Sequence, residues 1–162
     1  YSIDHLQYGL FGVFLLSLLG DVIMADFGVE LPVYSFVRRR RERVSGFTSS
    51  TLMLVGCLLS LQFFDFNVAL AAICILVFGD PAAALFGKLF GTPFYRKKSL
   101  IGCSAMFVVG IIVGLILLDS FWSIIGMALA GTIAEVFAHK IDDNLVIPLF
   151  SGLVGQIILW LL

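Results

Sequence analysis

Six apolar segments, separated by short polar connections, account for most of the 162 residues of this chain. The segments are Leu6–Phe27, Phe47–Phe64, Val68–Phe90, Leu100–Leu118, Phe121–Ala138 and Leu145–Leu162. An α-helix needs roughly 20 apolar residues to cross the hydrocarbon core of a bilayer, and each segment is close to that length. The pattern predicts an all-α integral membrane protein of about six transmembrane helices, with residues 1–162 forming a single transmembrane domain.

Composition supports this prediction, because apolar residues make up 60% of the chain and charged residues only 13%. Soluble domains usually contain about 25% charged residues, so a water-soluble globular domain fits poorly. Cys57, Cys74 and Cys103 lie singly inside apolar segments without CxxC spacing, and we expect them to be packing residues.

All ten lysine and arginine residues lie in three stretches, Arg38–Arg43, Lys88–Lys98 and Lys140. The connections that alternate with them, around Phe64–Asn67 and Asp119–Ser120, contain none. Positively charged connections of membrane proteins face the cytosol. We therefore expect a multi-pass protein with both termini on the non-cytosolic side. Its cytosolic face would hold every cation that can meet a phosphate, and so the functional site.

Three carboxylates inside the apolar segments lie at similar distances from the non-cytosolic side. Asp21, Asp80 and Glu135 follow the starts of their segments by 15, 12 and 14 residues. At about 1.5 Å per residue this places them roughly 18–22 Å into the bilayer. A lone charge there costs several kcal/mol, so we expect the three to form a cluster. Structural partners for arginine or backbone groups, and a proton or cation pathway, remain alternative interpretations.

The tripeptide Gly79-Asp80-Pro81 predicts a break in the third segment. A residue before proline avoids the α-helical region, and proline suits the first position of a new helix. We expect the helix to end at Asp80 and restart at Pro81. The exposed amides of the restarted helix would favour an anion, and Asp80 beside them would hold Mg²⁺.

Asp142, Asp143 and Asn144 lie where the last segment begins. As oxygen ligands they would complete a magnesium site with Glu135 or Asp80, and capping of the last helix is the alternative interpretation. The short basic stretch that contains Lys97 and Lys98 suits a phosphate, whereas Arg38–Arg43 can also serve only to fix the topology. No Walker A motif is present, so a nucleotide site must be built in another way.

Three segments in this order resemble the CTP-dependent lipid kinases. They are a GD(x)₂A(x)₃G run within Gly79–Gly91, a KS(x)₂G run within Lys98–Ser104, and Glu135 followed by Asp142–Pro148. The family includes dolichol kinase, phytol kinase and CTP-dependent diacylglycerol kinase, and is related in sequence to phosphatidate cytidylyltransferase. One departure is Ile101, where the family commonly has a glutamate that would be a further metal ligand.

The resemblance implies an enzyme that transfers the γ-phosphoryl group of CTP to the hydroxyl of a membrane lipid alcohol, of the polyprenol, dolichol or phytol type or a diacylglycerol. Asp80 and Lys98 are the expected catalytic residues. The expected Mg²⁺ ligands are Asp80, Glu135, Asp142 and Asp143. The expected nucleotide-binding residues are Gly79, Lys88, Lys97, Lys98, Ser99, Gly102, Asn144 and Arg41. The expected partners are CTP, the lipid alcohol and the bilayer, with no nucleic acid.

Two other functions use the same residue types. A cytidylyltransferase that attacks the α-phosphate and releases pyrophosphate needs the same nucleotide and metal. A small transporter would use the intramembrane acids for proton or cation coupling. The residue types alone do not separate these functions from the kinase.

Overall fold

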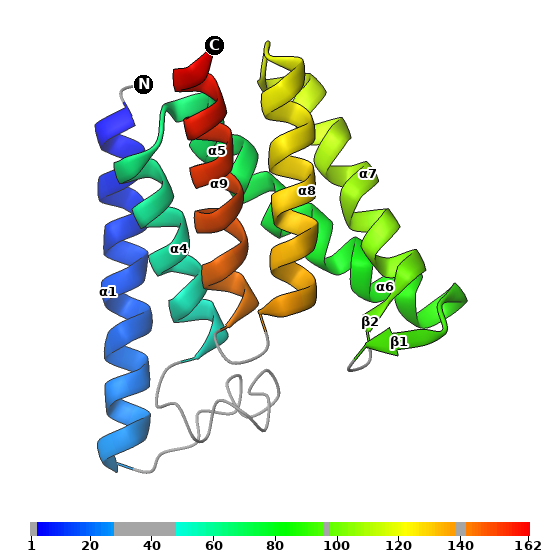
Figure 1. The fold of residues 1–162 in the computed structure, drawn as a ribbon. Coiled ribbons are helices and arrows are strands. Elements are labelled where there is room, and N and C mark those ends of the chain that lie inside the picture. Colours follow the sequence, from blue (N-terminus) through cyan, green and yellow to red (C-terminus); the bar gives the residue numbers. More distant parts are fainter. Residues whose placement is uncertain (1–2, 28–47, 96–97, 139–141) are drawn as a thin grey trace.

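The computed structural model describes residues 3–27, 48–95, 98–138 and 142–162. The described chain forms a bundle of six helical rods, which confirms the prediction of an all-α protein with six helices (Figure 1). The elements are α1 (Ile3–Phe27), α4 (Ser49–Phe63), a composite rod of α5 (Phe66–Cys74), the π-helix η1 (Ile75–Gly79) and α6 (Asp80–Phe90), α7 (Leu100–Leu117), α8 (Phe121–Phe137) and α9 (Asp143–Leu161). Among the described residues, three rods are long and apolar enough to cross a membrane, and three further apolar helices are shorter.

The helices pack around a narrow apolar core. α8 packs against both α7 and α9, α9 also contacts α4 and α5, and α1 lies at the edge of the bundle against α4 (Figure 1). The largest side chains that are almost fully buried include Val68, Ile75, Met106, Met127 and Ile147. Most other large apolar side chains are exposed on the outside of the bundle, as expected for a protein surrounded by lipid.

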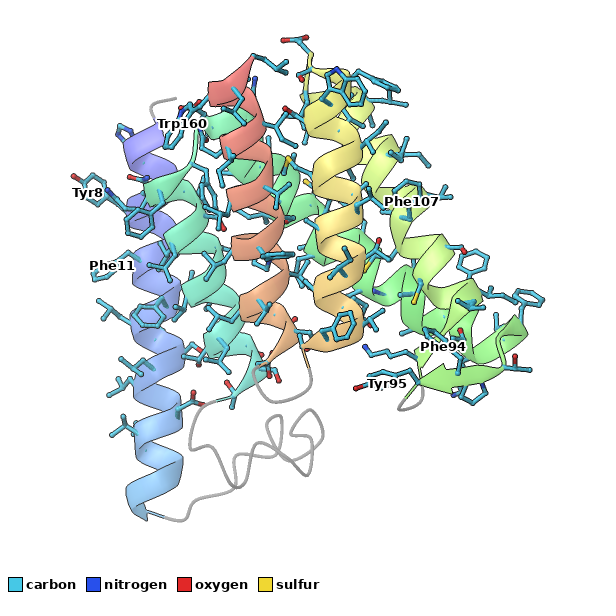
Figure 2. The ribbon with its side chains drawn as sticks, in the orientation of Figure 1. Tyr8, Phe11, Phe94, Tyr95, Phe107 and Trp160 are labelled. Atoms are coloured by element: carbon cyan, nitrogen blue, oxygen red, sulfur yellow. The ribbon has the colours of Figure 1, made fainter. Side chains whose placement is uncertain are left out.

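Exposed aromatic side chains mark the two ends of the bundle. Tyr8 and Trp160 are each 75% exposed and lie toward the end that holds both termini (Figure 2). Phe94 and Tyr95 lie at the opposite end (Figure 2). Tyrosine and tryptophan are enriched at membrane–water interfaces, so these positions agree with a bundle that spans a bilayer.

The predicted break at Gly79-Asp80-Pro81 is wrong. Gly79 and Asp80 both have helical backbone angles, with φ of −73° and −61°, and the rod continues through Pro81. A proline inside a helix clashes with the carbonyl four residues earlier, which is that of Val77. Val77 lies within the π-helical turn Ile75–Gly79, where the wider winding accommodates the proline without ending the helix. The predicted helix start, with free amides for an anion, is therefore absent here.

The glycines of α7 allow close packing against α8. An added Cβ at Gly110 would lie 2.9 Å from the Cβ of Ala128, and one at Gly114 would meet Ile124. Small residues at such contacts let transmembrane helices approach closely.

We expect Gly110→Leu to destabilise the protein by roughly 1–3 kcal/mol, because the larger side chain forces α7 and α8 apart. Gly12→Leu is the matched control, since nothing lies within 4 Å of a Cβ at Gly12. The free energy of unfolding, measured by titration with dodecyl sulfate, compares the two. Equal stability of the two variants would contradict the packing of α7 on α8.

Candidate functional site

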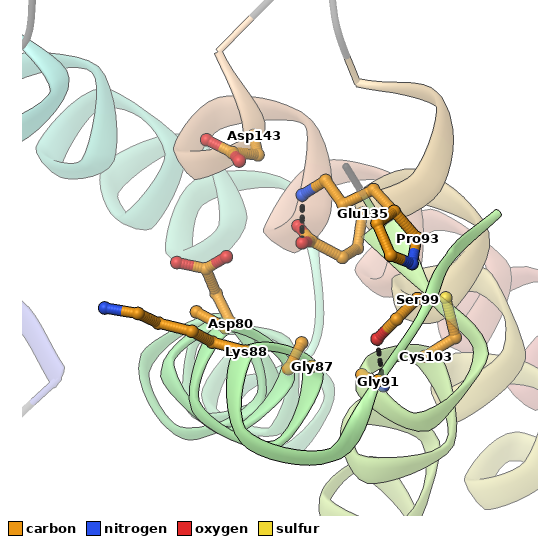
Figure 3. Close-up of a pocket in the computed structure, with 13 residues that line it drawn as sticks. Asp80, Gly87, Lys88, Gly91, Pro93, Ser99, Cys103, Glu135 and Asp143 are labelled. Carbon is orange, nitrogen blue, oxygen red and sulfur yellow. Dashed lines mark hydrogen bonds and ion pairs between the residues drawn. The ribbon is translucent and has the colours of Figure 1, made fainter. Parts of the chain in front are cut away.

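Three carboxylates from three helices meet at the end of the bundle opposite the termini. Asp80 is the first residue of α6, Glu135 lies in the last turn of α8, and Asp143 is the first residue of α9. One oxygen from each lies within 4.8 Å of the others (Figure 3). We call these three residues the acid group. Counting residues from the start of each apolar segment predicted that Asp80 and Glu135 lie at the same depth in the bilayer, and the structure brings them together.

Lys98 lies against the acid group. Its ammonium pairs with Oε1 of Glu135 (Figure 3). Among the described residues, Oε2 of Glu135 has no hydrogen-bond partner although the side chain is buried. Within the described part of the chain, Lys98 thus pairs directly with one of the three carboxylates, and one buried carboxylate oxygen is left without a partner.

A short hairpin places Lys98 and Ser99. Strand β1 (Pro93–Tyr95) pairs antiparallel with β2 (Lys98–Ser99), with Pro93 opposite Ser99 and Tyr95 opposite Lys98. Ser99 is the N-cap of α7, and its hydroxyl oxygen accepts the backbone N–H of Gly102 at 3.0 Å. The sequence predicted a short connection here, but not that the two strands pair.

The acid group lies in a pocket of about 440 Å³. Small-molecule sites are usually clefts of roughly 300–1,000 Å³, so the pocket is large enough for a ligand. Lys88, Lys98, Ser99 and Gly102, all expected site residues, line it together with the acid group. Lys88 is exposed and extends beside Asp80 (Figure 3).

Glycines form the wall of the pocket where α6 meets α7. An added Cβ at Gly102 would lie 2.7 Å from the carbonyl oxygen of Ala83, and one at Gly87 would lie 2.9 Å from the hydroxyl of Ser99. A Cβ at Gly91 would also collide with Ser99. Gly87, Gly91 and Cys103 line the pocket but were not expected site residues. The available signal for Gly87 was its place as the last glycine of the GD(x)₂A(x)₃G run, and for Gly91 it was the GxxxG spacing from Gly87.

The acid group fits a hard divalent cation. Three carboxylate oxygens this close repel one another, and the two lysines among the described pocket residues, Lys88 and Lys98, are fewer than the three acids. Mg²⁺ prefers oxygen ligands and usually keeps several waters beside one or two carboxylates. The unpaired Oε2 of buried Glu135 is the kind of atom that such a cation would satisfy.

The structure corrects two expected members of this cluster. Asp21 is buried away from it, where its Oδ2 accepts the hydroxyl of Thr51 at 2.7 Å. Asp142 is the N-cap of α9 rather than a member of the acid group. Its Oδ1 accepts the backbone N–H of Asn144 at 3.0 Å, and its Oδ2 accepts the hydroxyl of Ser49 at 2.9 Å. The sequence left open whether this segment binds a metal or caps the last helix, and in the structure Asp142 caps α9.

Two expected nucleotide-binding residues do not line the pocket. Gly79 is buried against Met106, whose Cγ lies 3.2 Å from an added Cβ. Asn144 directs its amide to the carbonyl of Ser49 at 3.5 Å. Lys97 and Arg41 lie outside the described residues.

Comparisons with known proteins agree with the resemblance predicted from the motifs. Over 110 residues the chain is 29% identical to a probable chloroplastic phytol kinase of Triticum aestivum, covering 56% of this chain and 37% of the relative. Over 76 residues it is 38% identical to CTP-dependent diacylglycerol kinase 1 of Eremothecium gossypii, covering 45% and 24%. Over 143 residues it is 27% identical to CTP-dependent diacylglycerol kinase 1 of Saccharomyces cerevisiae, covering 70% and 49%.

These relatives confirm the predicted similarity to the CTP-dependent lipid kinases at modest identity. The chain spans less than half the length of each of the three. No family model matches the chain. No solved structure matches it either.

Proposed function

We propose that the chain carries the catalytic centre of a CTP-dependent kinase that phosphorylates the hydroxyl of a membrane lipid alcohol. One observation carries the proposal: the acid group and two lysines, Lys88 and Lys98, line a single pocket at one end of a membrane bundle. The names of the relatives, phytol kinase and CTP-dependent diacylglycerol kinase, support the donor and the class of acceptor.

The acid group would hold Mg²⁺ together with the phosphates of CTP. When bound, the ion would supply charge neutralisation across the β- and γ-phosphates. Phosphoryl transfer depends mainly on positioning and electrostatic stabilisation, for which preorganised cations suffice. Lys98 is held in place by Glu135, and Lys88 extends over the same pocket, so both ammonium groups can face the transferring phosphoryl group.

The acceptor lipid would approach along α6. This helix turns Asp80 toward the pocket, while Leu85, Phe86 and Leu89 are exposed on its outer surface. The acceptor hydroxyl oxygen attacks the γ-phosphorus, the bond to the β–γ bridging oxygen breaks, and CDP leaves. The proton of the hydroxyl passes to a carboxylate of the acid group, for which Asp80 is the candidate because it lies on the same helix as these exposed apolar residues.

The charge distribution supports a pocket that faces the cytosol. Lys88 and Lys98 lie at the end of the bundle opposite both termini, and the connections at the end with the termini contain no lysine or arginine. Under the positive-inside rule the lysine-bearing end is cytosolic, where CTP is available.

Labelled CTP tests the proposed reaction directly. We expect purified protein in lipid nanodiscs to transfer label from γ-labelled CTP, with Mg²⁺, to at least one of phytol, a polyprenol or a diacylglycerol. CTP labelled in the cytidine should leave the lipid unlabelled. Cytidine label on the lipid would instead establish cytidylyl transfer. Nucleotide-independent cation uptake by liposomes containing the protein, without any label transfer, would establish the transporter.

A further inference from the structure

Asp21 is a buried carboxylate outside the pocket, on α1. Its side chain is only 3% exposed. Its Oδ2 accepts the backbone N–H of Thr48 at 3.0 Å and the hydroxyl of Thr51 at 2.7 Å. Thr48 is the N-cap of α4, and the unpaired N–H groups at a helix start favour a nearby negative charge. Asp21 therefore fixes the first turn of α4 relative to α1.

The first turn of α4 is bonded in turn to the first turn of α9. Ser49 donates its hydroxyl to Oδ2 of Asp142 at 2.9 Å, and the amide of Asn144 donates to the carbonyl of Ser49 at 3.5 Å. Asp143, between these two residues, is the α9 member of the acid group. Asp21 thus bonds to Thr48, and the next residue, Ser49, bonds to Asp142 and Asn144, the two sequence neighbours of Asp143.

The other two members of the acid group are held differently. Asp80 lies within a continuous helical rod, and Glu135 is paired with Lys98. Asp143 is the first residue of its helix, and the first turn of a helix frays unless its N–H groups are capped. The position of Asp143 therefore depends on the capping residue Asp142 and on the bonds to α4.

We propose that Asp21 is a positioning residue of the cation site, which through the first turn of α4 holds Asp143 in the acid group. This inference rests on the cation site of the proposed function. Loss of a group that orients a metal ligand typically weakens metal affinity by about 10–100-fold. If Asp21 only fastened α1 to α4, its loss would change stability and leave cation affinity unchanged.

Binding of Mn²⁺, a spectroscopic substitute for Mg²⁺, tests the inference without requiring activity. We expect Asp21→Leu, which removes the acceptor oxygens, to weaken the Mn²⁺ affinity of the purified protein about tenfold or more, measured from the free Mn²⁺ signal in electron paramagnetic resonance. Thr132→Val is the control, because the Thr132 hydroxyl bonds only to Ala128 within α8 among the interactions described. Its Mn²⁺ affinity should stay within about twofold of the parent protein.

Two variants at Ser49 test the hydrogen bonds between α4 and α9 while Asp21 stays unchanged. Ser49→Ala removes the bond to Asp142 and should weaken Mn²⁺ binding to a similar extent, whereas Ser49→Thr keeps a hydroxyl and should largely preserve it. If Asp21 and Ser49 position Asp143 through the same series of bonds, the double variant Asp21→Leu/Ser49→Ala will bind Mn²⁺ about as well as the weaker-binding of the two single variants. Multiplied effects, or unchanged affinity in Asp21→Leu, would overturn the positioning role.

The failure of this inference can be distinguished from failure of the cation site. The relevant Mn²⁺ site is the one that Asp143→Asn removes. If the parent protein lacks such a site, the cation site itself is wrong. If the site exists and Asp21→Leu leaves its affinity intact, only the positioning role is wrong.

Discussion

Asp143→Asn is expected to lower phosphoryl transfer by at least about hundredfold while leaving the bundle folded. The substitution keeps the size of the side chain at the start of α9 and removes one of the three charges of the acid group. Removing a single preorganised electrostatic contact to a transition state typically costs about 10²–10³ in rate, and a direct cation ligand belongs at the upper end of that range. Transfer of γ-label from CTP to the lipid, measured at saturating Mg²⁺, gives the rate.

Asp119→Asn is the matched control for this result. Asp119 lies in the connection between α7 and α8, at the end of the bundle opposite the acid group. The substitution makes the same chemical change far from the acid group. The rate of phosphoryl transfer by Asp119→Asn should therefore stay within about twofold of the parent protein. A folded Asp143→Asn protein with near-normal turnover would remove Asp143 from the site and would refute the acid group as the cation site.

Segment length and depth along each helix could be predicted from the sequence. The apolar runs predicted six helices because lipid demands a minimum length of apolar helix. Counting residues from the start of each run placed Asp80 and Glu135 at one level, where the structure brings them together.

Rotation and neighbours could not be predicted, because residue counting gives depth but not direction. Asp21 was placed at the same depth as the acid group, yet α1 packs at the edge of the bundle against α4, and its carboxylate meets threonines there. Asp142 and Asp143 are adjacent in sequence, so composition could not decide between them. The rotation of α9 places Asp143 in the acid group and Asp142 at the cap.

The mistaken break at Asp80 has a different cause. The local preferences of the Asp80-Pro81 pair favour a break, but a break at membrane depth leaves backbone groups without hydrogen bonds in a setting that offers little water. The π-helical turn before Pro81 relieves the proline clash while the rod stays continuous. In this environment the cost of unsatisfied backbone groups outweighs the local preference of two residues.

Lys98→Met is expected to destabilise the protein by about 3 kcal/mol in the absence of divalent cations. Losing one partner of a buried ion pair typically costs about 3–5 kcal/mol, because the remaining charge is left uncompensated. Glu135 is the remaining charge here and its side chain is only 5% exposed, while Lys98 is 34% exposed, which favours the lower end of that range. Lys88→Met, at an exposed lysine of the same pocket, should change stability by less than about 0.5 kcal/mol.

Glu135→Gln in the Lys98→Met background separates the structural effect from the chemical one. Removing the buried charge should restore most of the lost stability, measured by dodecyl sulfate titration, while phosphoryl transfer stays low because both a cation and a ligand are gone. Mg²⁺ should also narrow the stability deficit of Lys98→Met alone, since a cation in the acid group would compensate Glu135 in place of the lysine. If neither Glu135→Gln nor Mg²⁺ recovers stability, the Lys98–Glu135 pair does not balance the charge of the acid group, and the electrostatic basis of the proposed site fails.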